Sequence, residues 1–130
     1  MTDPLETLKR VFGFDHFRGV QDQVVERVLA GQNTLAVMPT GAGKSLCYQL
    51  PAVVREGTAL VISPLIALMH DQTRSANAIG LRAASLTSAD GDRQETIERL
   101  NAGKLDLLYV APERATGDSF RRLIGRTNLS

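Results

Sequence analysis

The chain has 130 residues, of which 43% are hydrophobic and 22% are charged. Because domains cluster at about 100–150 residues, this length excludes two complete domains, and the composition excludes a disordered, collagen-like or coiled-coil chain. Fifteen Lys and Arg against fourteen Asp and Glu give a formal charge of +1, so the charge excludes a basic field over the whole chain.

The first half of the sequence predicts two helices, a strand and a third helix. Asp3-Pro4, followed by leucines at helical spacing, is typical of a helix N-terminus and predicts a short helix. A second apolar stripe indicates a helix that ends at Gly31, where a left-handed residue would sit. The apolar run Thr34–Met38 predicts a buried strand, and Lys44–Val54 predicts a helix that Pro51 would kink or end.

The second half predicts strands that alternate with helices. The expected strands are Ala59–Ser63, Leu81–Leu86 and Leu105–Ala111, and the expected helices are Leu65–Ile79, Asp92–Asn101 and Asp118–Ile124. Ser85–Gly91 is the most loop-like stretch. This alternation predicts a parallel sheet covered by helices on both faces, which is the α/β class.

A phosphate-binding loop is predicted between the first strand and the helix after it, in Met38–Ser45 (MPTGAGKS). Glycines let the backbone N–H groups curl around phosphate, Lys44 supplies a positive charge and Ser45 a hydroxyl for Mg²⁺. Lys44 and Ser45 are therefore also the candidate catalytic residues. Met38 departs from the full pattern, which has glycine there, and the alternative is a glycine-rich turn with an incidental Lys-Ser. The candidate nucleotide-binding residues of the loop are Thr40, Gly41, Ala42, Gly43, Lys44 and Ser45.

Hydrolysis of a nucleoside triphosphate also needs a metal-holding acid from a second strand. No predicted strand after Ser45 ends in paired acids: Asp106 begins a strand, Asp71 lies in a helix and Glu113 follows a proline in a loop. We therefore expect this chain to bind nucleotide at best and not to hydrolyse it.

Four further strings accompany the loop in order: FGFDHFRGVQ at 12–21, CYQLP at 47–51, SPLIALMHDQ at 63–72 and YVAPER at 109–114. Together they resemble the RecQ family of superfamily-two DNA helicases, in register from about Leu5 to Phe120. DEAD-box RNA helicases share the general plan. The resemblance implies a RecA-like P-loop fold, with 1–31 as a helical lead-in and 32–130 as a partial lobe that stops before the family's Asp-Glu-Ala-His motif.

The first string resembles the family's adenine-recognition motif. The resemblance implies that Phe14 stacks on the purine, that the Gln21 amide reads its edge and that Arg18 adds a cationic contact. The alternative is that Phe14 and Phe17 belong to the core and that Gln21 is a neighbour of a helix N-cap.

The last two strings, at 63–72 and 109–114, resemble motifs that face single-stranded DNA. The implied DNA-binding residues are Ser63, Pro64, Gln72 and Arg114, because a strand-end hydroxyl, helix-start N–H groups and an arginine can hold phosphate. Capping or packing is the alternative for Gln72, and a loop salt bridge with Glu113 is the alternative for Arg114.

For the complete protein, the resemblance implies an ATP- and Mg²⁺-dependent helicase that moves 3′ to 5′ and unwinds DNA in repair and recombination. The expected partners are single-stranded DNA, duplex junctions and a single-stranded-DNA-binding protein, in the bacterial cytoplasm near the nucleoid. For the chain alone we expect unpaired sheet edges that lead to self-association.

The remaining polar residues point to no further chemistry. Cys47, the single cysteine, excludes a disulfide framework and suits a reducing compartment, and it is expected to be a small buried side chain. His16 and His70 lack partners at metal-ligand spacing.

No apolar run approaches the roughly 18–20 residues that cross a bilayer, and no secretory signal is expected. Other functions left open are a non-catalytic nucleotide- or nucleic-acid-binding module, another superfamily-two fragment and a small-molecule kinase.

Overall fold

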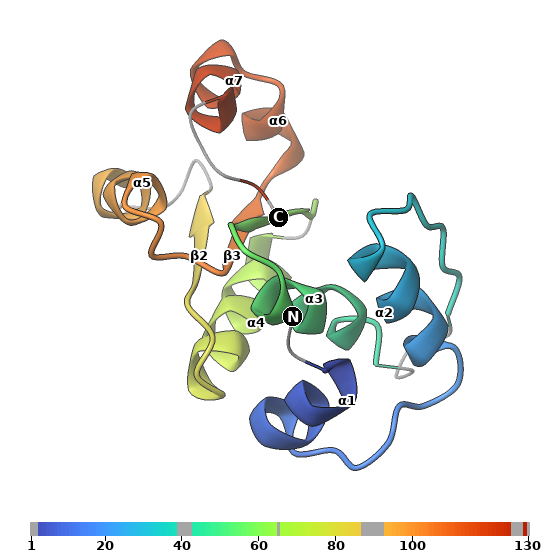
Figure 1. Cartoon of the computed structure of the whole chain (residues 1–130). Coiled ribbons are helices and arrows are strands. Elements are labelled where there is room, and N and C mark those ends of the chain that lie inside the picture. The colour runs from blue at the N-terminus through green and yellow to red at the C-terminus, as the bar shows by residue number, and fades with distance from the viewer. Residues whose placement is uncertain (1–2, 39–42, 65, 87–92, 126–128, 130) are drawn as a thin grey trace. The chain divides into compact units, whose positions relative to one another are not determined.

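The structure, a computed structural model, describes residues 3–38, 43–64, 66–86, 93–125 and 129. The chain divides into two compact units, Met1–Arg55 and Glu56–Ser130 (Figure 1). No helix in the described ranges is both long and apolar enough to span a membrane. The division into 1–31 and 32–130 stays a prediction.

The first unit is helical. Its elements are α1 (Pro4–Thr7), a π-helical turn η1 (Leu8–Phe12), α2 (Gln21–Leu29) and α3 (Leu46–Val54). The predicted start is confirmed, since the Asp3 carboxylate accepts a hydrogen bond from the Leu5 N–H, and Gly31 after α2 has the expected left-handed φ of 77°. A small apolar core holds the helices together. Its buried members are Leu8, Val25, Leu46 and Leu50, and Phe12, Phe17, Leu29 and Val54 pack against them.

The predicted strand Thr34–Met38 is wrong. The segment forms no strand and lies beside α2 in Figure 1, with the side chains of Leu35 and Val37 92% and 90% exposed. The apolar sequence predicted burial, but a strand exists only where a neighbouring strand takes up its backbone hydrogen bonds. No described residue pairs with this segment in a β-ladder.

The helix after the phosphate loop differs from its prediction in where it begins and in its course past Pro51. It begins at Leu46 rather than Lys44, because Lys44 and Ser45 form a turn. It also runs through Pro51 to Val54 instead of ending there, and the Arg55 N–H donates to the Pro51 carbonyl at 2.8 Å.

The second unit contains a parallel three-stranded sheet in the order β1-β3-β2. The strands are β1 (Ala59–Ile62), β2 (Ala83–Leu86) and β3 (Leu107–Val110), and the helices are α4 (Ile66–Ala78), α5 (Arg93–Asn101), α6 (Pro112–Ala115) and α7 (Asp118–Gly125). The predicted strands and helices of this half are therefore confirmed. The central strand β3 is fully buried, whereas β1 is half-buried and Ile62 at its end is exposed.

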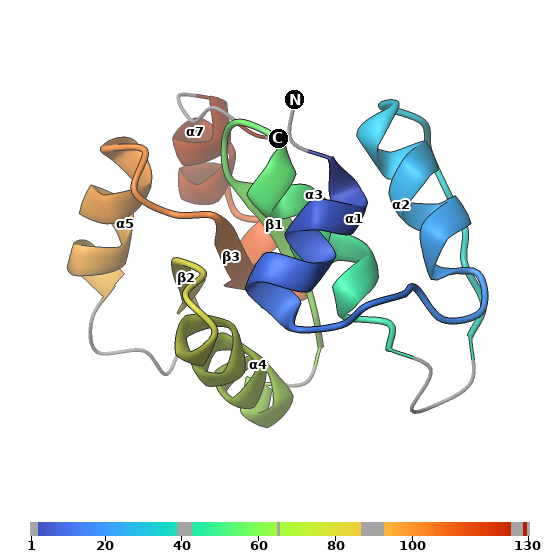
Figure 2. The ribbon, with the colours of Figure 1, turned by 60° about the horizontal axis from the view of Figure 1, so that its bottom comes forward.

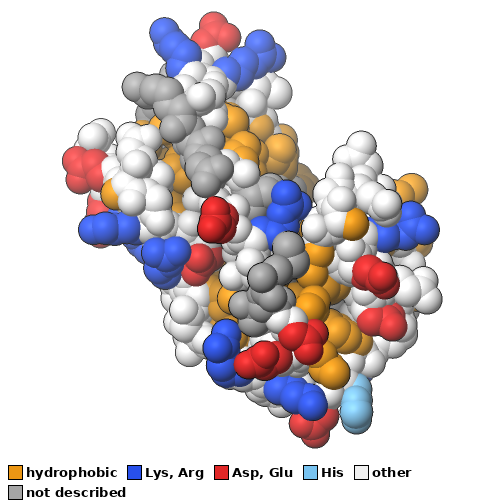
Figure 3. Space-filling view, viewed as in Figure 1, with side chains coloured by type: hydrophobic (Ala, Val, Ile, Leu, Met, Phe, Trp, Pro, Cys, Tyr) orange, Lys and Arg blue, Asp and Glu red, His pale blue; other side chains and the backbone are white. Residues whose placement is uncertain are grey.

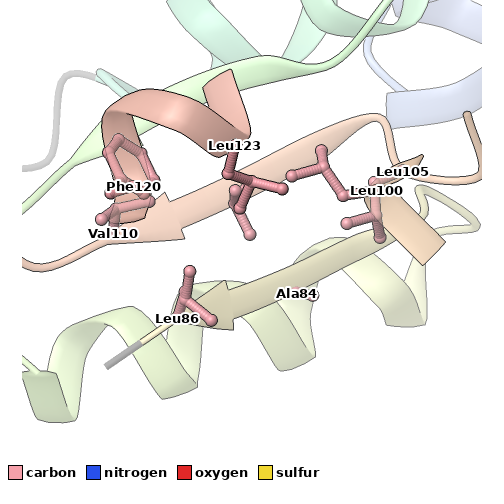
Figure 4. Close-up of a cluster of buried hydrophobic side chains, with 8 residues drawn as sticks. Ala84, Leu86, Leu100, Leu105, Val110, Phe120 and Leu123 are labelled. Atoms are coloured by element: carbon pink, nitrogen blue, oxygen red, sulfur yellow. The ribbon is translucent and has the colours of Figure 1, made fainter. Parts of the chain in front are cut away.

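Helices cover the sheet from both sides. Side chains from β2, β3, α5 and α7, together with Leu105 just before β3, form the main core, drawn in Figure 4: Ala84, Leu86, Leu100, Leu105, Leu108, Val110, Phe120 and Leu123. Figure 4 shows α4 on the other side of β2 and β3 from α7, and Figure 2 shows α4 beside β2. The expected α/β architecture is thus confirmed for this unit.

Polar side chains fix the start of β2. The Asn77 amide donates to the Ala83 carbonyl and accepts from the Ala83 N–H, each at 3.0 Å, as a neighbouring strand would. Arg82 binds Asp106 through its backbone N–H and its guanidinium, and this hydrogen bonding raises the pKa of Arg82. These contacts hold the beginnings of β2 and β3 side by side.

Two loop assignments need correction. Glu113 and Arg114 lie in the short helix α6, which Pro112 starts at its first position because proline there loses no helical hydrogen bond. Ser85, which the sequence placed both in the expected strand Leu81–Leu86 and in the loop-like stretch, belongs to β2, and 87–91 lie outside the described residues. On the face drawn in Figure 3, Lys and Arg side chains are interspersed with Asp and Glu, as the formal charge of +1 suggests.

Candidate functional site

The described part of the phosphate loop is Gly43–Ser45; Thr40, Gly41 and Ala42 lie outside the described residues. Lys44 is exposed and Ser45 is half-buried as the N-cap residue of α3. Neither side chain forms a hydrogen bond or ion pair within the described part of the chain. Both groups can therefore bind an outside ligand without first breaking such a contact.

Gln21 joins the first predicted motif to the phosphate loop. Its side chain is buried, with 3% exposed. The amide oxygen accepts from the Arg18 N–H at 2.8 Å, and the amide nitrogen donates to the Gly43 carbonyl at 3.0 Å. Gln21 directly follows Val20, the N-cap residue of α2, as the alternative interpretation predicts, and its contact with Gly43 brings the same amide to the loop. The adenine contact itself stays a prediction.

Gly43 is packed against this amide. Its φ is 77°, in the left-handed region that favours glycine. A Cβ at this position would lie 2.3 Å from Nε2 of Gln21 and 3.4 Å from Nη2 of Arg18. The glycine is needed for its backbone conformation and for the space that Gln21 occupies. Arg18, Gln21 and Gly43, all predicted as nucleotide-binding residues, thus lie together.

The two aromatic residues of the first motif differ in environment. Phe14 is 57% exposed and is not part of the core, so its ring is available for stacking. Phe17 is half-buried and packs against the core of the first unit, as predicted by the alternative interpretation in which Phe17 belongs to the core.

The predicted DNA-binding residues lie in the second unit. Neighbouring parallel strands end at the same edge of a sheet, and the Ser63 N–H donates to the carbonyl of Val110 at 3.1 Å. Ser63 and Pro64 after β1 therefore share an edge with the residues that lead from β3 into α6, where Arg114 is half-buried. Gln72 is half-buried within α4, and no contact between described residues places it at this edge.

Two of the three acids considered in the sequence, Asp106 and Asp71, bind arginines. Asp106 binds Arg82, and Asp71 forms an exposed ion pair with Arg74 one turn further along α4. Within the described ranges, no three His, Cys, Asp or Glu side chains form a group that could hold a metal ion. Cys47 is buried as expected, and burial raises the pKa of its thiol, which lowers its reactivity.

Two contacts were missed by sequence reasoning. Arg55 donates from Nη1 to the Val28 carbonyl at 3.1 Å, joining the ends of α3 and α2, and the Asn77 amide pairs with the backbone of β2. Neither residue stands in a pattern that predicts a partner, because both bind backbone atoms brought near by the fold.

Comparison with known proteins gives the family. A family model described as DEAD/DEAH box helicase matches residues 18–128. The chain is 48% identical over 127 residues to the ATP-dependent DNA helicase RecQ of Haemophilus influenzae, covering 96% of the chain and 20% of that protein. It is 46% identical over 121 residues to RecQ of Bacillus subtilis, covering 90% of the chain and 20% of that protein. The chain thus spans about a fifth of the length of these relatives.

A solved structure supports the fold. The crystal structure of a hypothetical ATP-dependent RNA helicase from Sulfolobus tokodaii matches 95% of the chain and 38% of its own chain, with a TM-score of 0.69 and 21% identity. At this identity the likeness shows the RecA-like fold alone. The family match over most of the sequence and the identity to RecQ proteins confirm the resemblance found in the motifs. The chain therefore belongs to the DEAD/DEAH box helicase family, among the RecQ helicases.

Proposed function

We propose that this chain is the nucleotide-binding part of an ATP-dependent DNA helicase. The observation that carries the proposal is the hydrogen bond from the Gln21 amide to the Gly43 carbonyl, which joins the candidate base reader to the phosphate loop within one unit. The RecQ relatives are named ATP-dependent DNA helicases, which supports ATP as the nucleotide.

In this proposal the loop residues Thr40 to Ser45 bind the triphosphate of ATP and the first motif binds its base. The exposed Lys44 ammonium neutralises the outer phosphates. The exposed ring of Phe14 stacks on adenine, with Gln21 at the adenine edge and Arg18 beside it.

Mg²⁺ would be held by the phosphates of ATP and by the hydroxyl of Ser45. That hydroxyl fits the role, since it is at the N-cap of α3 without forming a capping hydrogen bond. Bound Mg²⁺ would neutralise phosphate charge. Because no predicted strand after Ser45 ends in paired acids, we expect the chain to bind ATP without turning it over.

The DNA-binding part of the proposal rests on the sheet edge after β1 and β3. Ser63 and Pro64 lie at this edge with the chain leading to Arg114. Such groups can hold the phosphates of single-stranded DNA without reading bases, and Gln72 is proposed with them on the family resemblance alone.

For the whole protein we infer 3′-to-5′ unwinding of duplex junctions in the bacterial cytoplasm, in repair and recombination. A single-stranded-DNA-binding protein as partner and an association with the nucleoid are proposed on the same family resemblance.

The test is ATP binding to the 130-residue chain and to its Lys44→Ala variant, measured by isothermal titration calorimetry with Mg²⁺. We expect the variant to lose affinity by about 10- to 100-fold, the effect of removing a charged hydrogen-bond donor from phosphate. Lys9→Ala, which removes an exposed lysine elsewhere in the same unit, is the matched control and is expected to bind as the unchanged chain does.

Equal affinity in Lys44→Ala and the unchanged chain would refute the proposed phosphate site. A second assay measures phosphate release with single-stranded DNA present, where we expect none above background. Turnover that Lys44→Ala abolishes would contradict the expectation of binding without hydrolysis.

A further inference from the structure

The helix that carries the candidate base reader is held by polar contacts at both ends. At the N-terminus of α2, the Gln21 side chain donates to the Gly43 carbonyl. In its last turn, the Val28 carbonyl accepts a hydrogen bond from Nη1 of Arg55 at 3.1 Å. Both partners flank α3, because Gly43 precedes that helix and Arg55 directly follows it.

The contact of Arg55 suits the end of a helix. The last carbonyls of a helix have no partner within it, and they carry the partial negative charge of the helix dipole, which favours a cation. Val28 is one of these residues in α2, and its carbonyl also accepts from the Gly31 N–H at 3.0 Å. The Arg55 backbone is fixed to α3 by its own hydrogen bond to the Pro51 carbonyl, so the half-buried guanidinium reaches α2 from a fixed position.

Apolar contacts also join α2 and α3. Val25 lies in the core with Leu46 and Leu50, and Leu29 and Val54 pack against it. Apolar contacts depend on buried area and resist sliding or rotation of a helix only weakly, whereas hydrogen bonds depend on direction and distance. The two end contacts therefore set the register of α2 against α3.

We propose that Arg55 is a positioning residue for the adenine site. By holding the C-terminal end of α2 to the end of α3, it keeps Gln21 at a fixed place relative to the phosphate loop, which precedes the same α3. This inference rests on the proposed function and adds a residue that lies in none of the motifs.

The experiment compares Arg55→Met with the unchanged chain. Methionine keeps an apolar stem and removes the donor. ATP and inorganic tripolyphosphate are titrated separately by calorimetry, because tripolyphosphate reaches only the phosphate loop. We expect the variant to bind ATP about 3- to 10-fold more weakly, the effect of one lost hydrogen bond, and to bind tripolyphosphate as before. A merely destabilised unit would lose both ligands together.

Two further variants separate the hydrogen bond from the charge. Arg55→Lys keeps a donor and is expected to recover part of the ATP affinity. Arg27→Met removes an exposed arginine from the last turn of α2. It takes away a similar positive charge near the end of the helix, but it leaves the hydrogen bond from Arg55 to the Val28 carbonyl in place. We expect it to bind ATP as the unchanged chain does.

Hydrogen–deuterium exchange gives a readout that does not need a ligand. We expect faster exchange of the α2 amides in Arg55→Met and not in Arg27→Met. Unchanged exchange, or an equal loss of ATP and tripolyphosphate, would overturn the role of Arg55. Failure of the unchanged chain to bind either ligand would instead refute the proposed function, while the exchange comparison still decides whether Arg55 fixes α2.

Discussion

At the scale of single residues, Gly43 meets two separate demands. Its φ of 77° lies in the region that other residues avoid, and the place where a Cβ would lie is taken by the Gln21 amide. Gly31 has the same φ of 77°, and nothing lies within 4 Å of its Cβ position. Alanine substitutions at the two glycines therefore separate the stability cost of the left-handed backbone conformation from the cost of displacing the Gln21 amide.

We predict that Gly43→Ala destabilises the chain more than Gly31→Ala. The left-handed conformation costs a residue with a Cβ about 1–2 kcal/mol at either position. At Gly43 the added methyl also displaces the buried Gln21 amide from its partners, which costs about another 1–3 kcal/mol. Urea unfolding followed by circular dichroism measures the difference, and ATP affinity is expected to fall only in Gly43→Ala.

The same comparison has an internal check. Gln21→Ala in the Gly43→Ala background removes the group that the methyl strikes, so this double variant is expected to lose less than the sum of the two single effects. Equal stability of Gly43→Ala and Gly31→Ala would show that the Gln21 contact contributes nothing.

Sequence motifs point to the candidate site residues but not to the connections between them. Gly43 and Lys44 follow from the spacing of the phosphate loop, and Gln21 follows from the resemblance to the family's adenine motif. The contact of Arg55 with Val28 leaves no such trace, since a backbone carbonyl is present in every residue and only the fold selects which one is near. The same holds for Asn77 and the backbone of Ala83.

At the scale of elements, the Asn77 side chain forms hydrogen bonds to the start of β2 that a second neighbouring strand would otherwise form. Its amide forms both hydrogen bonds to Ala83 that an adjacent strand would form. A side chain at the end of α4 thus protects the beginning of a strand whose backbone would otherwise lack these partners.

We predict that Asn77→Ala destabilises the second unit by about 1–3 kcal/mol, because the Ala83 N–H and carbonyl each lose a partner. Asn101→Ala, at the end of α5, is the matched control; Asn101 is also exposed, and its side chain forms no hydrogen bond within the described residues. The control is expected to change stability by less than about 0.5 kcal/mol. Urea unfolding and hydrogen exchange at the Ala83 amide are the measurements, and slow exchange in Asn77→Ala would contradict the assigned role.

The elements of the second unit were predictable because their pattern matches what each one buries. The continuous apolar run of β3 is buried on both faces, as a central parallel strand requires. Thr34–Met38 has a similar apolar pattern, and its residues Thr34 to Val37 are exposed. The difference lies in the presence of a neighbouring strand, and a local pattern contains no information about that neighbour.

At the scale of the whole molecule, the exposed segment Thr34–Val37 bears on association between copies of the chain. The segment contains no charged residue and no proline, although natural proteins use charged residues and proline to protect open strand edges. Together with α2 it borders a groove of about 390 Å³, lined on the helix side by Val20, Gln23, Val24 and Arg27. Its exposed apolar side chains, and a backbone that pairs with no other strand among the described residues, form a surface on which another extended chain can pair.

We predict that the chain self-associates through this segment and that Leu35→Lys reduces the association. A lysine on an open edge opposes strand pairing, because a second copy would bring like charges together and bury them. Sedimentation velocity over a range of protein concentrations measures the monomer fraction, which is expected to rise in Leu35→Lys. Leu5→Lys is the matched control, since Leu5 is an exposed leucine on a helix whose backbone is already hydrogen-bonded. If both variants raised the monomer fraction equally, general hydrophobic attraction rather than strand pairing would drive the association; if neither did, the segment would have no part in it.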